Sequence, residues 1–224
     1  MKYKKVYDVF YQIPRLGLLR LSDGGGPLGF DITTAIQFDY LIRRYKCDSI
    51  FETGCFLGDT TEYLSKMYPQ LTIISCDIND DYFKFTRNRL KKSKNVILEN
   101  TNSPEVIIKY QGQFKTPFFY LDAHWYGYWP LIDEIRSIQK GIVCVDDFNI
   151  ENERFSFDTY DNQVCDYELI LASNHNVKTI YVNNPNCLYP YPCLQIGRRS
   201  GKGYFQIGHK TNPFKRSIFF SKLV

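Results

Sequence analysis

The sequence predicts an α/β fold in which helices cover both faces of a doubly wound, mostly parallel sheet. Three observations predict it. Between residues 47 and 150, short apolar runs of strand length alternate with segments whose apolar residues recur at helical spacing. A loop with two glycines follows the first of these runs, where such a sheet turns into its first helix. The chain has 224 residues, 44% hydrophobic and 23% charged, which suits one domain with a large core.

The elements follow one another in a regular order. After an irregular opening over residues 1–21, a helix over 33–44 carries Ile36, Phe38 and Leu41 at helical spacing. Strands are then predicted at 49–52, 72–76, 95–99, 118–121 and 142–145. The helices between them are predicted at 60–67, 81–91, 104–110 and 131–139. Apolar strands separated by amphipathic helices are typical of a parallel sheet that is buried on both faces.

Past residue 150 the alternation changes. A helix is predicted at 167–174 and strands at 177–182 and 217–221. Between these two strands, residues 183–215 are rich in Pro, Gly and Arg and are predicted to form a long loop. Two late strands after five parallel ones complete a Rossmann-like sheet of seven strands, with the last strand antiparallel.

Composition argues against several classes of protein. The formal net charge of +4 is modest and no basic stripe is visible, so nucleic acid is not an expected partner. No segment approaches the roughly 18 apolar residues of a membrane span, and the N-terminus has no signal-peptide pattern. The seven cysteines show no CxxC spacing, and Cys47, Cys55, Cys76 and Cys144 adjoin apolar runs. We therefore expect a cytoplasmic protein with reduced core thiols.

The loop after the first strand reads Glu-Thr-Gly-Cys-Phe-Leu-Gly at positions 52–58. Its ExGxxxG spacing differs from the GxGxxG of dinucleotide enzymes, and the carboxylate of Glu52 disfavours a pyrophosphate there. A carboxylate beneath the loop suits a cofactor with an amino group and a sulfonium. The next strand ends at Asp77, which can accept both hydroxyls of a ribose, and Ile78 can pack on an adenine. The alternative is that Gly54 and Gly58 serve only a turn.

Polar residues at 100–103 follow the third strand, so that three strand ends carry suitable groups. Over about residues 48–150 this series resembles the motifs of class I S-adenosylmethionine-dependent methyltransferases. The resemblance implies that Gly54 and Gly58, with Cys55 and Phe56 between them, line the methionine part of the cofactor. It also implies that Asp77 holds the ribose and that Asn102 or Ser103 lies near the adenine.

Three carboxylates follow the fourth and fifth strands. Asp122 ends the fourth strand and Asp146 and Asp147 end the fifth, and adjacent strands lie about 5 Å apart. These side chains can therefore converge on one cation, and carboxylate oxygens with open water positions suit Mg²⁺. The alternative is that one aspartate caps the following helix while the others are solvated.

Here the sequence resembles the metal-dependent O-methyltransferases of the catechol type and of the type that methylates antibiotic sugars. The resemblance implies Asp122, Asp146 and Asp147 as metal ligands, with Asp122 also beside the cofactor. The catechol type has a lysine shortly after its first metal aspartate, and this chain has none. The sugar type has an acidic residue two positions after that aspartate, where this chain has His124. We expect His124 to act as the general base, or else to contact adenine or Asp122.

The substrate is the least determined part of the prediction. The aromatic fraction of 17% and a metal able to bind two neighbouring oxygens favour a sugar hydroxyl, on a glycan or a small natural product, over a catechol-like phenol. Arg198, Arg199 and Lys202 in the late loop can clamp a phosphate or carboxylate, or can simply be solvated. The rival functions are a metal-independent methyltransferase, a non-catalytic cofactor-binding module and, less well supported by the loop spacing, a nicotinamide oxidoreductase.

These expectations divide a single methyltransferase domain, residues 1–224, into three parts. Residues 1–46 form an N-terminal helix and lid, in which a mobile stretch at 24–27 covers the site. Residues 47–150 form the cofactor-binding core. Residues 151–224 supply the late strands and the substrate loop. A homo-oligomer is left open.

Overall fold

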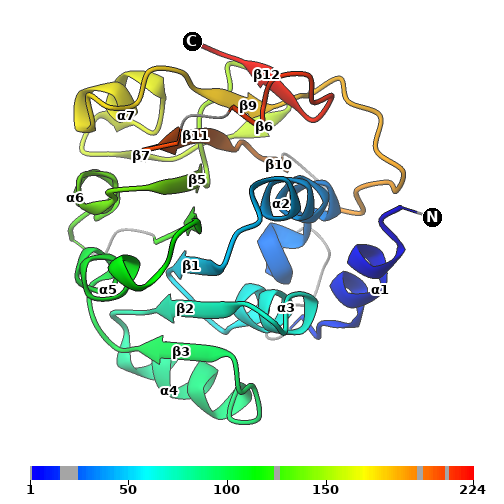
Figure 1. The fold of residues 1–224 in the computed structure, drawn as a ribbon, viewed down its shortest axis with the longest axis vertical. Helices are drawn as coiled ribbons and strands as arrows, with labels where there is room; N and C mark the ends of the chain where they lie inside the picture. Colours follow the sequence, from blue (N-terminus) through cyan, green and yellow to red (C-terminus); the bar gives the residue numbers. More distant parts are fainter. Residues whose placement is uncertain (1, 16–24, 124–126, 196–198, 210–211) are drawn as a thin grey trace.

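A computed structural model describes residues 2–15, 25–123, 127–195, 199–209 and 212–224 (Figure 1). Its main sheet has eight strands, whose order is β12-β9-β11-β5-β4-β1-β2-β3. Their bounds are β1 Ser49–Thr53, β2 Thr72–Cys76, β3 Val96–Glu99, β4 Pro117–Leu121, β5 Gly141–Val145, β9 Tyr181–Asn183, β11 Gly203–Ile207 and β12 Phe220–Lys222. Two small sheets pair β6 (Phe155–Ser156) with β10 (Arg199–Ser200) and β7 (Thr159–Tyr160) with β8 (Gln163–Val164).

The first five strands are parallel, as predicted, and their order confirms the doubly wound topology. β1 pairs with β2 on one side and with β4 on the other, so the direction of winding reverses at β1. All five carboxyl ends lie at the same edge of the sheet. The loop at 54–58 and the segments that begin at Asp77, Asp122 and Asp146 therefore all leave the sheet at this edge.

The late strands differ from the prediction. The strand predicted at 177–182 is β9 and the one predicted at 217–221 is β12, but β11 was predicted as loop. β11 lies between β5 and β9 and is antiparallel to both, and β12 adds an eighth strand at the edge beyond β9. Because β11 runs antiparallel to β5, its first residues lie beside the carboxyl end of β5, with Gly203 opposite Val145.

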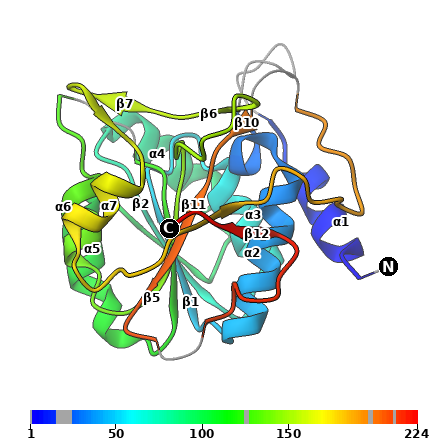
Figure 2. The same ribbon diagram turned by 90° about the horizontal axis from the view of Figure 1, so that it is seen from above.

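Helices cover both faces of the sheet (Figures 1 and 2). Helices α1 (Lys4–Gln12), α2 (Ile32–Tyr45) and α3 (Asp59–Met67) lie on one side, and α5 (Ser103–Tyr110), α6 (Leu131–Ser137) and α7 (Tyr167–Ser173) on the other. Helix α4 (Asp80–Arg89) packs near β3. The described residues also form two short 3₁₀ helices, η2 (Pro27–Phe30) and η3 (Gln111–Gln113).

Strand alternation sends neighbouring residues into two separate cores. Ile50 packs on the face that carries α1, α2 and α3, whereas Phe51 packs on the opposite face. The same division repeats at Phe118 and Phe119 of β4. Because both faces are buried, each strand is apolar at nearly every position, which is why the parallel run was visible in the sequence.

The N-terminal region is more ordered than predicted. Residues expected to be irregular form α1, which buries Val6 and Phe10. Helix α2 is buried along most of its length, so it belongs to the core and not to a lid. The stretch before it is held against α3, since the amide of Gly26 donates to Asp59 at 2.8 Å and that of Leu28 donates to Thr60 at 2.9 Å.

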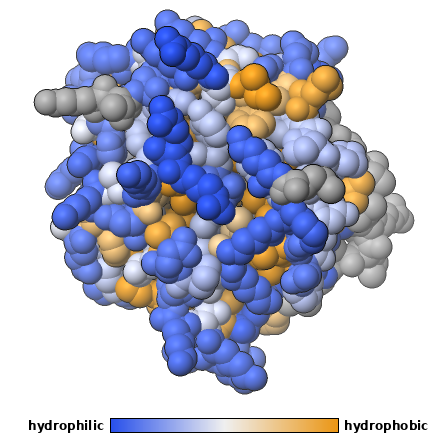
Figure 3. All heavy atoms as spheres, turned by 45° about the vertical axis from the view of Figure 1, so that its right-hand side comes forward, coloured by the Kyte–Doolittle hydropathy of each residue, from blue (hydrophilic) through white to orange (hydrophobic). Residues whose placement is uncertain are grey.

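Most large apolar side chains of the described residues lie in the interior of the protein. The face turned forward in Figure 3 carries mostly hydrophilic side chains, with hydrophobic ones in small groups between them. Among the described residues, no helix has the length and apolar character to cross a membrane. All seven cysteines are free thiols, and the four predicted to lie in the core are buried.

Candidate active site

A cavity of about 160 Å³ opens at the carboxyl edge of the sheet, beside the point where the winding reverses. Three predicted cofactor segments meet in it: the loop after β1, the end of β2 and the start of α5. It is lined by Gly54, Phe56, Cys76, Asp77, Ile78, Asn79, Tyr82, Thr101, Asn102, Ser103, Asp122, Ala123, Tyr128 and Pro130. Ligands of doubly wound folds bind at this position in general.

Gly54 allows the loop after β1 to lie against the segment after β4. Its φ of +75° is in the left-handed region, and a Cβ there would stand 2.7 Å from the carbonyl oxygen of Asp122 and 2.9 Å from the Cα of Ala123. Both obstacles are backbone atoms, so a side chain has no room. The loop at Gly54, which forms the floor of the cavity, therefore directly contacts the start of the acidic rim, which consists of Asp122, Asp146 and Asp147.

Asp77 shapes the wall of the cavity. One of its oxygens accepts from the amide of Phe56 at 2.8 Å and the other from the amide of Asn79 at 2.9 Å. Burial raises the pKa of this carboxyl, and the two amides partly oppose the shift. Each carboxylate oxygen has two lone pairs, so the oxygen that accepts from Asn79 retains one for a ligand hydroxyl, whereas the other also accepts from the thiol of Cys55 at 3.9 Å.

Two apolar side chains stand at the mouth of this cavity. Phe56 is 50% exposed and meets the ring of Tyr82 edge-on at 4.7 Å, and Ile78 is 62% exposed. Exposed apolar groups beside a polar wall provide a surface for a flat ring. On the far side, Asn102 and Ser103 begin α5, and the buried Ser103 hydroxyl has no hydrogen-bond partner among the described residues.

Three predicted cofactor residues lie behind the cavity instead of lining it. Glu52 is buried and accepts hydrogen bonds from Thr61 at 2.5 Å and Ser75 at 2.7 Å. Burial raises its pKa to about 7. Cys55 is buried next to the loop, and Gly58, with φ +77°, begins α3 and lies against Thr86. The contacts of these residues support the loop from below.

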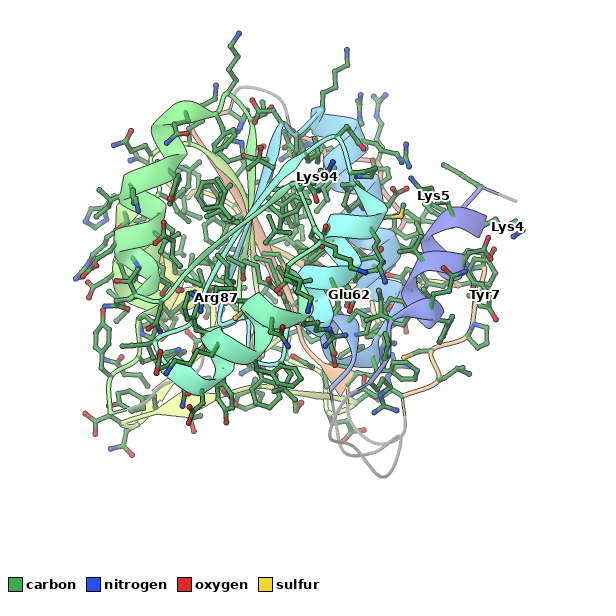
Figure 4. All side chains as sticks on the ribbon, turned by 90° about the horizontal axis from the view of Figure 1, so that it is seen from below. Lys4, Lys5, Tyr7, Glu62, Arg87 and Lys94 are labelled. Carbon is green, nitrogen blue, oxygen red and sulfur yellow. The ribbon has the colours of Figure 1, made fainter. Side chains whose placement is uncertain are left out.

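A charged cluster fixes the outer end of the loop. Figure 4 labels Glu62 on α3, which accepts from Arg89 of α4 at 2.6 Å. Arg89 also donates to the carbonyl of Leu57 at 2.7 Å and to Asp59. The same Asp59 accepts from Gly26, so one guanidinium joins α4, α3, the loop and the segment before α2.

Next to this cavity lies a second, smaller one of about 20 Å³. The two share Asp122 and Ala123. The predicted trio borders the smaller cavity, and the ligand atoms of Asp122, Asp146 and Asp147 lie within 4.8 Å of one another. The expected convergence of the three carboxylates is thus confirmed, whereas a bound cation stays a prediction.

A lysine that was predicted to lie in a loop supplies a cation to the carboxylates of Asp122, Asp146 and Asp147. Lys202, 1% exposed, directs its ammonium at Oδ1 of Asp146. Burial opposes the charge on Lys202, but the carboxylates of Asp146 and Asp147 outweigh it and raise its pKa. Burial likewise opposes the charge on Asp146, and Lys202 outweighs it, so that the pKa of this carboxyl falls well below its usual range.

Asp147 occupies a different environment from its neighbour. Its backbone has a φ of +46°, and its carboxylate accepts from the hydroxyl of Ser200 at 2.6 Å. Burial and the adjacent charge of Asp146 raise its pKa to about 6. Glu134 of α6 faces the same cavity, and burial raises its pKa to about 7.

The remaining sequence-based expectations fall into two groups. His124 and Arg198 lie outside the described residues. Arg199, expected either to clamp a ligand or to be solvated, instead donates to Asp31 at 2.6 Å and to Thr33 at the start of α2. Lys202 neither clamps a ligand nor is solvated, because its side chain is buried and forms an ion pair with Asp146.

Comparison with known proteins agrees with this geometry at the level of fold: the chain has the fold of the S-adenosylmethionine-dependent methyltransferases. A methyltransferase of this kind from Aquifex aeolicus superposes with a TM-score of 0.52 at 13% identity, over 80% of this chain and 90% of that one. A candidate O-methyltransferase from Klebsiella pneumoniae gives 0.51 at 12% identity, over 91% and 90%. The N-methyltransferase NodS from Bradyrhizobium japonicum gives 0.50 at 10% identity, over 79% and 97%. No protein-family model and no curated protein matches the sequence.

Proposed function

We propose that this protein is an S-adenosylmethionine-dependent methyltransferase. The observation that carries the proposal is the larger cavity, in which the backbone of Gly54 and the carboxylate of Asp77 face one space at the reversal point of the sheet. Its polar wall suits a ribose, and its apolar mouth at Phe56 and Ile78 suits an adenine. Among the neighbours in fold, the protein from Aquifex aeolicus is named as dependent on S-adenosylmethionine.

Within this proposal each lining residue has a task. Asp77 accepts the ribose hydroxyls, while Asn102 and Ser103 supply polar groups near the base. The backbone at Gly54 and Asp122 borders the end that faces the smaller cavity. When bound, S-adenosylmethionine supplies a methyl group on a sulfonium, which a nearby nucleophile can accept. Glu52, Cys55 and Gly58 keep the loop in shape.

The acceptor we propose is a hydroxyl of a sugar, a glycan or a small natural product. The smaller cavity is bordered by Asp122, Asp147 and Asp158, and carboxylates accept hydrogen bonds from hydroxyl groups. His124 follows Asp122 by two residues, and we propose it as the base that removes the hydroxyl proton. A catechol-like phenol is the second candidate acceptor.

The expected Mg²⁺ does not fit the trio as it stands. Asp146 lies within hydrogen-bond reach of four donors: Lys202, the hydroxyl of Ser200 at 2.5 Å and the amide of Asp147 at 2.7 Å on Oδ1, and Tyr120 on Oδ2. The Ser200 hydroxyl is also 2.6 Å from Asp147 and gives its single proton to one of the two carboxylates. Oδ1 is therefore fully occupied, and a cation at the one lone pair left on Oδ2 would be repelled by the Lys202 ammonium. We therefore derive no step of the reaction through a metal.

Calorimetry and a transfer assay test the proposal. We expect S-adenosylmethionine to bind the purified protein and NAD not to bind. Transfer of a labelled methyl group should then be scored on sugars, phenols and amines, because fold neighbours include an N-methyltransferase. Binding without transfer to any acceptor would favour the non-catalytic module, and failure to bind S-adenosylmethionine would refute the proposal.

A further inference from the structure

We infer that the ammonium of Lys202 takes the place of a divalent cation at the acidic rim, so that this protein works without a metal. The inference concerns the rim of the proposed methyltransferase and rests on that function for its catalytic meaning. Its structural part, that the rim holds its own cation and binds no Mg²⁺, stands by itself.

Lys202 lies directly beside Asp146 of the rim. β11 is antiparallel to β5, and the pairing of Gly203 with Val145 places Lys202 next to Asp146, at the carboxyl end of the neighbouring strand. The backbone of Lys202 is held on both sides by Asn183, whose side chain accepts from the Lys202 amide at 2.8 Å and whose amide donates to the Lys202 carbonyl. The backbone of Lys202 is therefore held in place directly before β11 begins at Gly203.

Two glycines, Gly201 and Gly203, flank Lys202. A Cβ on Gly201 would stand 2.1 Å from the carbonyl oxygen of Phe148, and one on Gly203 would stand 2.6 Å from the ring of Phe148. Only glycine lets the chain pass this close to the turn that follows Asp146 and Asp147. The Gly-Lys-Gly sequence thus lets the backbone pass close enough for Lys202, next to the Ser200 hydroxyl, to reach the rim.

The charges of the rim and of Lys202 leave little room for a divalent cation. Three ionised aspartates carry a formal charge of −3, and Lys202 reduces this to −2 in a half-buried cluster. The side chains of Lys202 and Asp146 are 2% and 8% exposed, so water screens their attraction little. A divalent cation would have to displace this ammonium or share Asp146 with it, and cations at such short range repel each other strongly.

The acceptor would consequently be positioned by hydrogen bonds to the rim carboxylates and not by chelation of two neighbouring oxygens. Lys202 does not border either cavity, so it acts through Asp146 as a positioning residue. Its role is to fix the carboxylate of Asp146 in place, while Asp122 and Asp147 border the small cavity.

The test is a titration of the wild-type protein with Mn²⁺, followed by the signal of the free ion in electron paramagnetic resonance. We expect no stoichiometric binding at millimolar Mn²⁺, and methyl transfer that is unchanged by a chelator. Stoichiometric Mn²⁺ binding, or transfer lost on chelation and restored by Mg²⁺, would overturn the inference. S-adenosylmethionine binding is measured separately, and its absence would instead count against the proposed function.

Variants at Lys202 give a second readout that a purely structural role does not predict. Lys202→Met uncovers Asp146 and should raise Mn²⁺ affinity by roughly tenfold or more, whereas Lys202→Arg keeps the charge and should not. The double variant Lys202→Met/Asp146→Asn removes both charges and should show no gain. If Lys202→Met folds and its Mn²⁺ affinity is unchanged, the inference that the Lys202 ammonium takes the place of a divalent cation is refuted. If that variant does not fold, the wild-type titration decides.

Discussion

Glu134 offers a test of the burial described for the smaller cavity. Its side chain lies on α6, the residue is 1% exposed, and its Oε1 has no hydrogen-bond partner among the described residues. Burial raises the pKa of this carboxyl to about 7, from 4.5 in a solvated chain. Below the lower value it is protonated in both the folded and unfolded states. As the pH rises through this window, the folded protein holds a proton that the unfolded chain releases, so Glu134 lowers stability progressively.

Each pKa unit corresponds to about 1.4 kcal/mol, so the full cost above the window is about 3 kcal/mol. Glu134→Gln removes this cost and keeps the shape of the side chain. Relative to wild type, the variant should gain about 2.5 kcal/mol in free energy of unfolding between about pH 5 and about pH 8. At about 2–4 °C per kcal/mol for a chain of this size, the relative Tm gain is roughly 5–10 °C.

The assay is urea or thermal unfolding of both proteins at the two pH values. Any packing change caused by the amide, including a new contact with Ser103, is the same at both and cancels in the comparison. A Glu134→Gln effect that is equal at both pH values would refute the reasoning, because it would mean that Glu134 is not desolvated.

Three further substitutions test the site. Gly54→Ala should lose about 1–3 kcal/mol of stability through its positive φ and its clash with the Asp122 backbone, whereas Gly112→Ala, where a Cβ meets nothing within 4 Å, should be near neutral in urea denaturation. Asp77→Asn should weaken S-adenosylmethionine binding roughly 10–100-fold in calorimetry, since hydrogen bonds to charged groups contribute about 1.5–3 kcal/mol. Unchanged affinity would remove Asp77 from the site. Arg199→Met should cost about 1–3 kcal/mol by leaving the buried Asp31 unpaired. The exposed Arg136→Met should cost less than about 1 kcal/mol, and equal losses would contradict this account.

The parallel half of the sheet was predictable because its pattern is local. Strands buried on both faces are continuous apolar runs, and each site residue follows directly after such a run. Asp77, Asp122 and Asp146 could therefore be placed at one edge without knowing any long-range contact. The convergence of the trio followed from strand order alone.

The features that escaped prediction depend on contacts distant in sequence. β11 begins with Gly203 and follows a lysine, which locally resembles a loop, and only its pairing with β5 makes it a strand. The partner of Lys202 lies 56 residues earlier, so nothing near position 202 reveals it. The two glycines around the lysine were the available signal, because unexplained glycines often mark a close approach of backbones.

Helix α1 was missed for a different reason. Its first residue follows Tyr3, which provides no side-chain cap, and it buries few side chains.

Glu52 was expected to face the cofactor because it ends a strand. In the structure its carboxylate lies toward Thr61 of α3 and Ser75 of β2, beneath the loop.

The position of Lys202 also bears on how the chain can be divided. Residues 47–150 contain every motif that suggested a function, and they resemble a self-contained nucleotide-binding half. Yet β5 would be left as an open edge without β11, and Asp146 would be left without its counter-charge. A fragment or a fusion that ends after residue 150 would keep the recognisable motifs while losing the electrostatic balance of the rim. The part of the chain that keeps the rim intact therefore extends at least through β11.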